Sequence, residues 1–518
     1  MKHYIAMVIF VLLIMPVRAS AQTPPDLTEV SMTEMREMMS TGSLTSLEVV
    51  NYYLGRIHMH NQQGADLRAV ISLLDIDQAR ALAVELDKER AAGISRGPLH
   101  GIPVLIKDNI DTADGLANTA GSWLLRDNYP SDDAFIIKQL RAAGAIILGK
   151  ANLSEWANFR STESSSGWSS MGGQTKNPYD TTRSPCGSSS GSAVAVSANF
   201  IAGAVGTETD GSLICPAHIN GIVSIKPTVG LLSRDGIIPI SHSQDTAGPM
   251  TRTVADAALM LTVMAGYDER DEQSFASSID YTQALKEDSL KGKRLGVVRD
   301  LSGYHSGVDE LFNTRLEQLR AAGAIIVDDL TWPNGRHWDN AEFEVLLHEF
   351  KFGLADYLAT TDLPYRSLAD LISTNQTYQS RVMPWFGQEL FQMSEQRTEA
   401  NVEQYLAAKE RAATEAGEKS IDALLAEHNL DAIVAPSGGP AWKIDPITGD
   451  HFLGSSSGAP AVAGYPHITV PMGLVQHLPV GMSFFASAKQ EALLFEIAYG
   501  FEQLTQARTV PSLQPFGH

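Results

Sequence analysis

The spacing of hydrophobic and polar residues predicts a helical N-terminal part followed by alternating strands and helices. Apolar residues in 27–93 recur every three or four positions, which indicates amphipathic helices, and Thr45 with Glu48 marks a helix start. Short apolar runs at 102–106 and 145–148 indicate buried strands, with a helix between them. This alternation is typical of an α/β fold.

The remainder of the chain continues this alternation. No Pro- or Ser-rich linker divides it, so we predict one large domain. Its expected parts are a helical N-terminal part at 27–93, a core at about 97–330, a helical insertion at about 330–430, and strands with a last helix at 431–508. The further strands are expected at 295–298, 432–435, 467–470 and 482–485, and the last helix at about 491–506.

One short sequence occurs twice, at 139–147 and at 318–326. Both copies read Gln-Leu-Arg-Ala-Ala-Gly-Ala-Ile-Ile, but the residues around them do not match. A duplicated domain would need a sustained repeat. We therefore interpret both copies as the same local solution, in which a helix ends at a glycine cap and a buried strand follows.

The first 21 residues have the layout of a secretory signal. Lys2 and His3 precede an apolar run at 4–15, and Ala-Ser-Ala at 19–21 fits a cleavage site. The run is shorter than the roughly 20 residues that a membrane helix needs, so an uncleaved anchor is the weaker interpretation. We expect residues 1–21 to be removed and the mature protein, from residue 22 on, to be exported to the periplasm or secreted.

The composition is that of a globular protein, with 518 residues, 44% hydrophobic and 19% charged. Its 60 acidic and 39 basic residues give a net charge of -21, which makes nucleic acid and anionic membrane surfaces unsuitable partners. Two cysteines cannot build a zinc cage. His348-Glu349 begins a zinc-protease-like string, but position 352 is Phe, so the second histidine is missing. We expect no metal site.

Ser and Gly crowd the stretch from 161 to 192, which leads directly into the apolar run 193–196. A flexible linker is one interpretation, and the entrance to a buried helix is the other. The stretch lacks the Gly-Lys-Ser/Thr ending of a nucleotide P-loop. Gly-Ser-Ser-Ser-Gly at 187–191 fits the nucleophile-elbow pattern, as does the same string at 454–458, but each lacks one of the flanking elements that an elbow requires.

Three segments fit one another chemically. Lys107 follows the strand at 102–106, where removal from water lowers the pKa of an amine and makes it usable as a base. Pairing with a carboxylate, such as that of neighbouring Asp108, is the alternative. The second segment is the loop around Ser188, and the third is the turn at 206–212, whose successive N–H groups could form an oxyanion hole beside a serine.

Together these segments resemble the amidase signature family. The family pattern is a Gly-Gly-Ser-Ser-Gly-Gly-Ser loop followed by Gly-Thr-Asp-Thr-Gly-Gly-Ser. Here the two segments read Cys-Gly-Ser-Ser-Ser-Gly-Ser at 186–192 and Gly-Thr-Glu-Thr-Asp-Gly-Ser at 206–212. Gly-Ile-Pro…Lys-Asp-Asn at 101–109 and Asp-Thr-Ala-Gly-Pro-Met at 245–250 match as well. The resemblance extends over about 27–504 and is greatest to bacterial peptide amidases, which remove the C-terminal amide of peptides.

The resemblance implies a mixed β-sheet core covered by helices on both faces, and a mechanism without a cofactor. Ser212 matches the nucleophile that forms an acyl-enzyme, and Lys107 matches the general base. Ser188 matches the serine that follows a cis peptide bond and bridges the other two. The backbone N–H groups that match the oxyanion hole belong to Thr209, Asp210, Gly211 and Ser212.

The chain departs from the family pattern at Cys186, Ser190 and Asp210, which replace glycines, and at Ile214, which replaces an arginine. Asp tolerates a positive φ better than most residues, so we expect the turn to survive. The missing arginine and the expected export argue against a tRNA-linked amidotransferase subunit. Cys186 and Cys215 lie close in sequence to the two serines. Two buried thiols are the favoured interpretation, and a disulfide in an oxidising compartment is the alternative.

Three functions remain open on the sequence alone. The first is an exported serine amidase that hydrolyses a small-molecule or peptide amide. The second is a lipid- or aryl-amide hydrolase of the same family, which would differ only in the pocket for the acyl group. The third is a non-catalytic protein that uses the Ser/Gly loops as an anion nest. The oligomeric state is left open.

Overall fold

The computed structural model describes residues 25–333, 335 and 338–513, so the expected signal at 1–21 lies outside the described residues. Its core is an 11-stranded mixed sheet in the order β1-β3-β2-β6-β8-β7-β12-β13-β11-β9-β10, and β4 and β5 form a separate two-stranded sheet. The strands are β1 Val70–Leu73, β2 Pro103–Lys107, β3 Ile146–Ala151, β4 Trp168–Ser169, β5 Gly173–Gln174, β6 Gly203–Glu208, β7 Val223–Lys226, β8 Thr246–Thr251, β9 Arg294–Val298, β10 Ile325–Leu330, β11 Ala432–Pro436, β12 His467–Val475 and β13 Leu478–Phe485.

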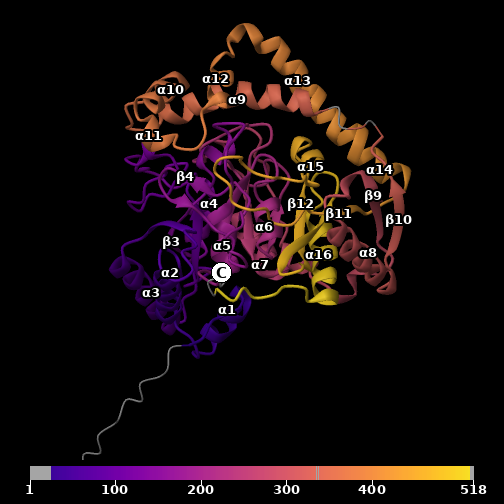
Figure 1. The fold of residues 1–518 in the computed structure, drawn as a ribbon. Helices are drawn as coiled ribbons and strands as arrows, with labels where there is room; N and C mark the ends of the chain where they lie inside the picture. Colours follow the sequence, from indigo (N-terminus) through magenta and orange to yellow (C-terminus); the bar gives the residue numbers. More distant parts are fainter. Residues whose placement is uncertain (1–24, 334, 336–337, 514–518) are drawn as a thin grey trace, which may run out of the picture.

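Helices pack around this sheet, as the expected α/β class requires, and α9 to α14 form an arch over one side of the molecule (Figure 1). Within the described residues, none of the helices is both long and apolar enough to cross a bilayer. The helices are α1 Met32–Ser40, α2 Ser46–His60, α3 Ile76–Ala91, α4 Phe135–Ala142, α5 Ser190–Ser197, α6 Ile214–Ile219, α7 Val254–Met264, α8 Ser306–Ala321, α9 Asp339–Ala359, α10 Leu368–Thr377, α11 Gln379–Val382, α12 Glu389–Glu395, α13 Val402–Ala416, α14 Ala423–Glu427, α15 Gly458–Val462 and α16 Glu491–Thr505.

The strands and helices expected from periodicity are present. β2, β3, β9, β11, β12 and β13 occur at the predicted runs, α16 covers the predicted last helix, and Thr45 with Glu48 forms a capping box at the start of α2. Two expectations are incomplete. β1 interrupts the stretch that was expected to be helical throughout, and β6, β7 and β8 were not expected. β1 and β7 have only four residues each, and β6 and β8 contain glycine or proline, which are uncommon in strands, so pairing with neighbours in the sheet is what defines them.

The two copies of the repeated sequence have the same local structure. α4 is followed by Gly144 at φ 87° and β3, and α8 is followed by Gly323 at φ 94° and β10. The expectation of two buried strands is half wrong. β3 is buried along its length, whereas β10 is the last strand of the sheet and leaves Ile325 45% exposed. An edge strand has no neighbour to cover one of its sides.

Candidate active site

Parallel pairing of β2 with β6 brings the predicted lysine to the predicted turn. Leu105 pairs with Ala204 and Ile106 with Val205, so the carboxyl ends of both strands lie at the same edge of the pair. Lys107 ends β2, and its Nζ lies 2.7 Å from the Thr207 hydroxyl and 3.1 Å from the Thr207 carbonyl oxygen. Two segments a hundred residues apart thereby meet at one point.

The Ser/Gly loop completes this cluster as it enters α5. Lys107 Nζ lies 2.8 Å from Ser188 Oγ, and the peptide bond between Gly187 and Ser188 is cis. The Ser189 N–H donates to the Ser212 carbonyl oxygen at 3.2 Å, which joins the loop to the turn. The structure therefore brings Lys107, Ser188 and Ser212 together, and the flexible-linker interpretation of the loop is wrong.

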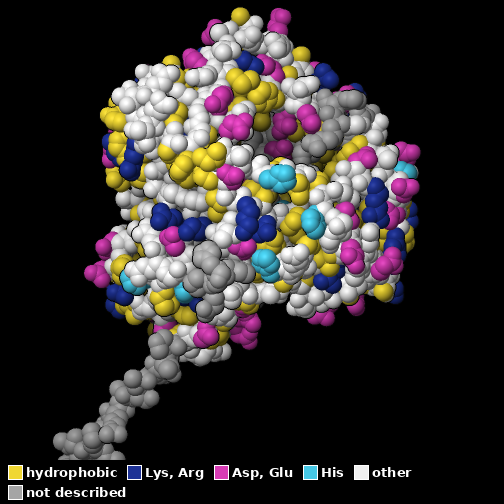
Figure 2. Space-filling view, viewed as in Figure 1, with side chains coloured by type: hydrophobic (Ala, Val, Ile, Leu, Met, Phe, Trp, Pro, Cys, Tyr) yellow, Lys and Arg dark blue, Asp and Glu magenta, His cyan; other side chains and the backbone are white. Residues whose placement is uncertain are grey.

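The three residues differ in exposure. Lys107 and Ser188 have no exposed surface, whereas Ser212 retains 9%. A cleft of about 380 Å³ reaches Gly187, Asp210 and Gly211, which adjoin the two serines in sequence. Figure 2 shows the surface hollowed beneath the arch, with acidic side chains around the hollow. The cleft therefore extends to the residues next to Ser212, which is the one of the three with any exposed surface.

Burial changes the acid–base character of Lys107. Loss of solvation lowers the pKa of its amine from 10.5 to about 7, although the carboxylates of Asp245 and Glu208 oppose this shift. Asp108 accepts hydrogen bonds from Thr119 instead, and the charge that acts to lower its pKa is that of Lys150. The alternative of a Lys107–Asp108 pair is therefore wrong, and a neutral amine is accessible near pH 7.

The turn after β6 is held from both sides. The Glu208 carboxylate accepts hydrogen bonds from the N–H groups of Leu213 and Ile214 at 2.7 and 3.1 Å. The Thr209 hydroxyl donates to Asp245 at 2.5 Å. The positive φ that was anticipated at Asp210 falls on Gly211, at 75°. A glycine adopts that conformation without a steric cost, which removes the difficulty foreseen for Asp210.

Ser457 contributes to the site and was not predicted, although the string that contains it was noticed in the sequence. The second Gly-Ser-Ser-Ser-Gly string, at 454–458, was interpreted only as an elbow. It leads into α15, and the Ser457 hydroxyl donates to the Asp210 carboxylate at 2.7 Å. The repeated string thus borders the same cleft as the first one, and Ser457 binds the side chain that most distinguishes this turn from the family pattern.

Cys186 and Cys215 form a disulfide, with their Cα atoms 6.0 Å apart, so the favoured interpretation of two free thiols is wrong. The two cysteines meet because each lies close in sequence to one of the two site serines. Cys186 precedes Ser188 by two residues and Cys215 follows Ser212 by three, so joining the two serine segments also joins the cysteines. The Ser190 hydroxyl, which replaces a glycine, donates to the Cys186 carbonyl oxygen at 2.6 Å and closes the same loop.

We expect thiol titration of the denatured, unreduced protein to find no free thiol. Replacing both cysteines with alanine should lower the free energy of unfolding by roughly 3.5 kcal/mol, because the bond closes a loop of 29 residues. Chemical denaturation of the two proteins measures that difference. Two titratable thiols in the unreduced protein would contradict the bond.

The chain is similar to known amidases over most of its length. The model of the family described as Amidase matches residues 48–495. The native peptide amidase from Stenotrophomonas maltophilia is 49% identical, with a TM-score of 0.90 over 94% of this chain and 99% of that one. A protein named as a probable amidase in Arabidopsis thaliana is 40% identical over 93% of this chain and 91% of its own length. A glutamyl-tRNA(Gln) amidotransferase subunit of Chloroflexus aurantiacus is 34% identical over 93% of this chain and 98% of its own length.

These similarities extend over nearly the whole chain, and the family model includes all three site residues that the sequence singled out. The expected resemblance is therefore confirmed at the level of the family and of its fold. The chain belongs to the amidase signature family, and it is an amidase that hydrolyses C–N bonds.

Proposed function

We propose that this protein is an exported serine amidase that hydrolyses the C-terminal carboxamide of peptides through a Ser-Ser-Lys relay. The observation that carries the relay is the 2.8 Å approach of Lys107 Nζ to Ser188 Oγ, two side chains with no exposed surface. Ser212 adjoins this pair through the hydrogen bond from Ser189 and is the member of the trio that a substrate can reach.

Counting donors and acceptors around Lys107 supports its role as the base. A neutral amine has two N–H groups and one lone pair. The Thr207 carbonyl oxygen can only accept, and the Thr207 hydroxyl oxygen, which also accepts from Asn109 at 3.0 Å, can take the second N–H. The lone pair is then left for the Ser188 hydroxyl, which is the arrangement that a proton acceptor needs.

The proposed reaction proceeds in two halves. Ser212 Oγ attacks the carbonyl carbon of the amide while its proton passes to Ser188 Oγ and the Ser188 proton passes to Lys107. Backbone N–H groups of the turn at 209–212 stabilise the negative oxygen. When the C–N bond breaks, the relayed proton returns to the leaving nitrogen, which departs as ammonia. Water then cleaves the Ser212 ester by the same relay and releases the carboxylate.

Two observations support a peptide amide as the substrate. The peptide amidase from Stenotrophomonas maltophilia shares 49% identity with almost all of this chain. The cleft is large enough for a side chain next to the amide, and Trp442 and Phe452 line it as an edge-to-face pair with ring centres 5.7 Å apart. A screen of ammonia release over peptide amides, short aliphatic amides and long-chain or aryl amides tests the proposal. A preference for long-chain or aryl amides would replace it with the lipid- or aryl-amide alternative.

Export is supported by the signal layout of residues 1–21 and by the disulfide, which persists in an oxidising compartment and is rare in a reducing one. Expression in a bacterial host should give a protein that is recovered outside the cytoplasm and begins at Gln22. Recovery of the full-length chain in the cytoplasm alone would overturn this part of the proposal.

We expect Ser188→Ala to lower kcat by roughly 10²- to 10³-fold, because Lys107 then has no path to the nucleophile. Ser189→Ala is the matched control. The Ser189 hydroxyl donates to the Thr207 carbonyl oxygen at 2.9 Å and accepts from the Thr207 N–H at 3.1 Å, which supports the loop without offering a relay. Steady-state ammonia release compares the two variants. If Ser189→Ala were much the more damaging, the relay would be assigned to the wrong serine.

A further inference from the structure

A buried glutamate of the arch binds the catalytic core. Glu349 lies on α9 and is 5% exposed. One of its carboxylate oxygens accepts hydrogen bonds from the Ser241 hydroxyl and, at 2.9 Å, from the Ser243 N–H. The other accepts from the Ser243 hydroxyl at 2.6 Å and from the Tyr405 hydroxyl of α13 at 2.5 Å. One side chain of the arch therefore holds a core loop at three donor groups.

That loop, residues 240–245, is itself attached to the turn that carries Ser212. Asp245 accepts from the N–H groups of Ile240 and Ser241 at 2.8 and 2.9 Å, which closes the loop on itself. Its other oxygen accepts from the Thr209 hydroxyl at 2.5 Å. Asp245 thus holds both Ser241 and the turn, and links the loop to the segment that carries Ser212.

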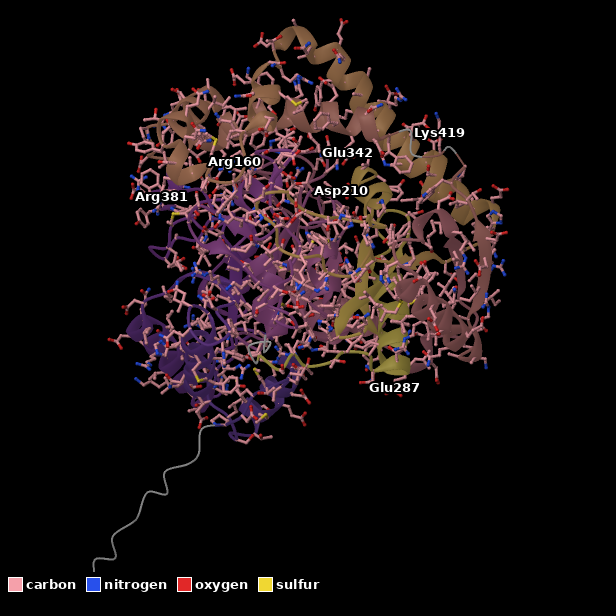
Figure 3. The ribbon with its side chains drawn as sticks, viewed as in Figure 1. Arg160, Asp210, Glu287, Glu342, Arg381 and Lys419 are labelled. Carbon is pink, nitrogen blue, oxygen red and sulfur yellow. A yellow bond between two sulfur atoms is a disulfide. The ribbon has the colours of Figure 1, made fainter. Side chains whose placement is uncertain are left out.

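A second, parallel connection runs through Gln244. Its side-chain amide donates to the Thr209 carbonyl oxygen at 3.3 Å and to Glu342 at 2.9 Å. Glu342 belongs to α9, and Figure 3 labels it at the arch, above Asp210 in this view. Two residues of one helix therefore reach the turn through two neighbouring residues of one loop.

The Glu349 carboxyl is ionised, which strengthens its hold on the loop. Burial alone would raise the pKa of its carboxyl, but hydrogen bonds from Ser241, Ser243 and Tyr405 outweigh that effect and lower it. The carboxylate stays charged near neutral pH, and Lys409 lies 3.4 Å from it. Hydrogen bonds to a charged acceptor are about twice as strong as neutral ones, so the loop is held firmly.

We propose that Glu349 is a positioning residue for the amidase reaction, and that it acts through the 240–245 loop to set the turn that presents Ser212. The proposal rests on the proposed function only in taking Ser212 as the nucleophile. It also gives the arch a role in turnover, because the loop is held between the arch and the turn.

The test compares Glu349→Gln with Glu344→Gln. Both replace a carboxylate on α9, but Glu344 pairs with Arg397 inside the arch, at 2.7 and 2.9 Å, and does not belong to the path to the loop. Glu349→Gln should lower kcat about 10-fold with KM changed less than about 2-fold, because misplacing a nucleophile costs mainly the chemical step. Glu344→Gln should retain kcat within about 2-fold.

Reaction with a fluorophosphonate separates positioning from loss of fold. An activated serine hydroxyl attacks its phosphorus, forms an O–P bond, and releases fluoride and the hydroxyl proton. Glu349→Gln should react several-fold more slowly than the native protein but reach the same stoichiometry of one label per chain. A slower reaction with a reduced final stoichiometry means partial unfolding and would overturn a positioning role. Equal kcat and equal labelling rates in Glu349→Gln and the native protein would also overturn it.

Two further variants keep the proposal testable if Glu349→Gln does not fold. Ser243→Ala removes a hydroxyl on the loop side of Glu349, and Tyr405→Phe removes one on the arch side. Ser243→Ala should lower kcat several-fold and Tyr405→Phe should leave it nearly unchanged. The reverse order would overturn the proposed path. If the native protein were not labelled at Ser212 at all, the proposed nucleophile would be wrong, whatever these variants showed.

Discussion

Ser212→Ala is expected to reduce kcat by about 10⁴-fold or more while leaving the fold intact. Removing a nucleophilic serine in a relay abolishes the covalent route, and losses of this size are measured for serine hydrolases. The side chain lies on a turn and retains 9% exposure, and the change removes a single oxygen atom, so its loss creates almost no cavity. Ammonia release measures the effect, and the Tm of the variant should lie within a few degrees of the native value.

Covalent labelling provides the control for this prediction. The native protein should take up one fluorophosphonate per chain, mass spectrometry should place it on Ser212, and Ser212→Ala should take up none. Substantial turnover by Ser212→Ala would remove the nucleophile assignment. Labelling of Ser188 in the native protein would reverse the order of the two serines in the relay.

Lys107→Met is expected to lower kcat/KM by roughly 10³- to 10⁴-fold above pH 7, because the relay loses its proton acceptor. Methionine preserves the length and the burial of the side chain, so packing changes little. In the native protein, kcat/KM should fall tenfold per pH unit below an apparent pKa of about 7, where Lys107 becomes protonated. The residual activity of Lys107→Met should not show that acid limb.

The free energy of unfolding should also depend on pH through the protonation of Lys107. The folded-state pKa of Lys107 is about 7 and its ordinary value is 10.5, so between these values the unfolded chain binds more protons than the folded one. The free energy of unfolding contributed by this group therefore rises with pH across that window. The stability advantage of Lys107→Met over the native protein should be greatest below pH 7 and shrink towards pH 10.

Denaturation curves at several pH values measure this difference. A constant stability difference from pH 6 to 10 would mean that Lys107 does not carry a depressed pKa. If the acid limb of kcat/KM persisted in Lys107→Met, another group would be responsible. Lys226, also buried, has its pKa lowered to about 8 and would be the next residue to test.

The three site motifs could be recognised from the sequence because each one is a short, continuous run of residues. Gly-Ile-Pro…Lys-Asp-Asn, the Ser/Gly loop and the turn at 206–212 each occupy a short run of sequence, and a buried strand ending in lysine can be recognised from its composition. From these runs the α/β class, the family, and Lys107, Ser188 and Ser212 as candidates could all be predicted. The strand positions of β2, β3, β9, β11, β12 and β13 followed from apolar runs in the same way.

What sequence reasoning missed depends on contacts between distant segments. β7 has only four residues, and β6 and β8 contain glycine or proline, so none of the three was recognised from its own sequence, and their place in the sheet comes from their partners. The disulfide was judged the weaker alternative because cysteine spacing alone does not indicate whether two segments meet. The contact of Ser457 with Asp210 joins residues 247 positions apart.

The sequence by itself determined the chemistry that this protein can perform, because the residue types of a site and the short patterns around them are written consecutively along the chain. Only the tertiary structure decided how those groups are supported. Glu349 appeared in the sequence as part of an incomplete metal motif, and in the fold it holds the loop beside the Ser212 turn. Its role depends on where α9 is placed over the sheet, and long-range packing, which no local pattern encodes, sets that placement.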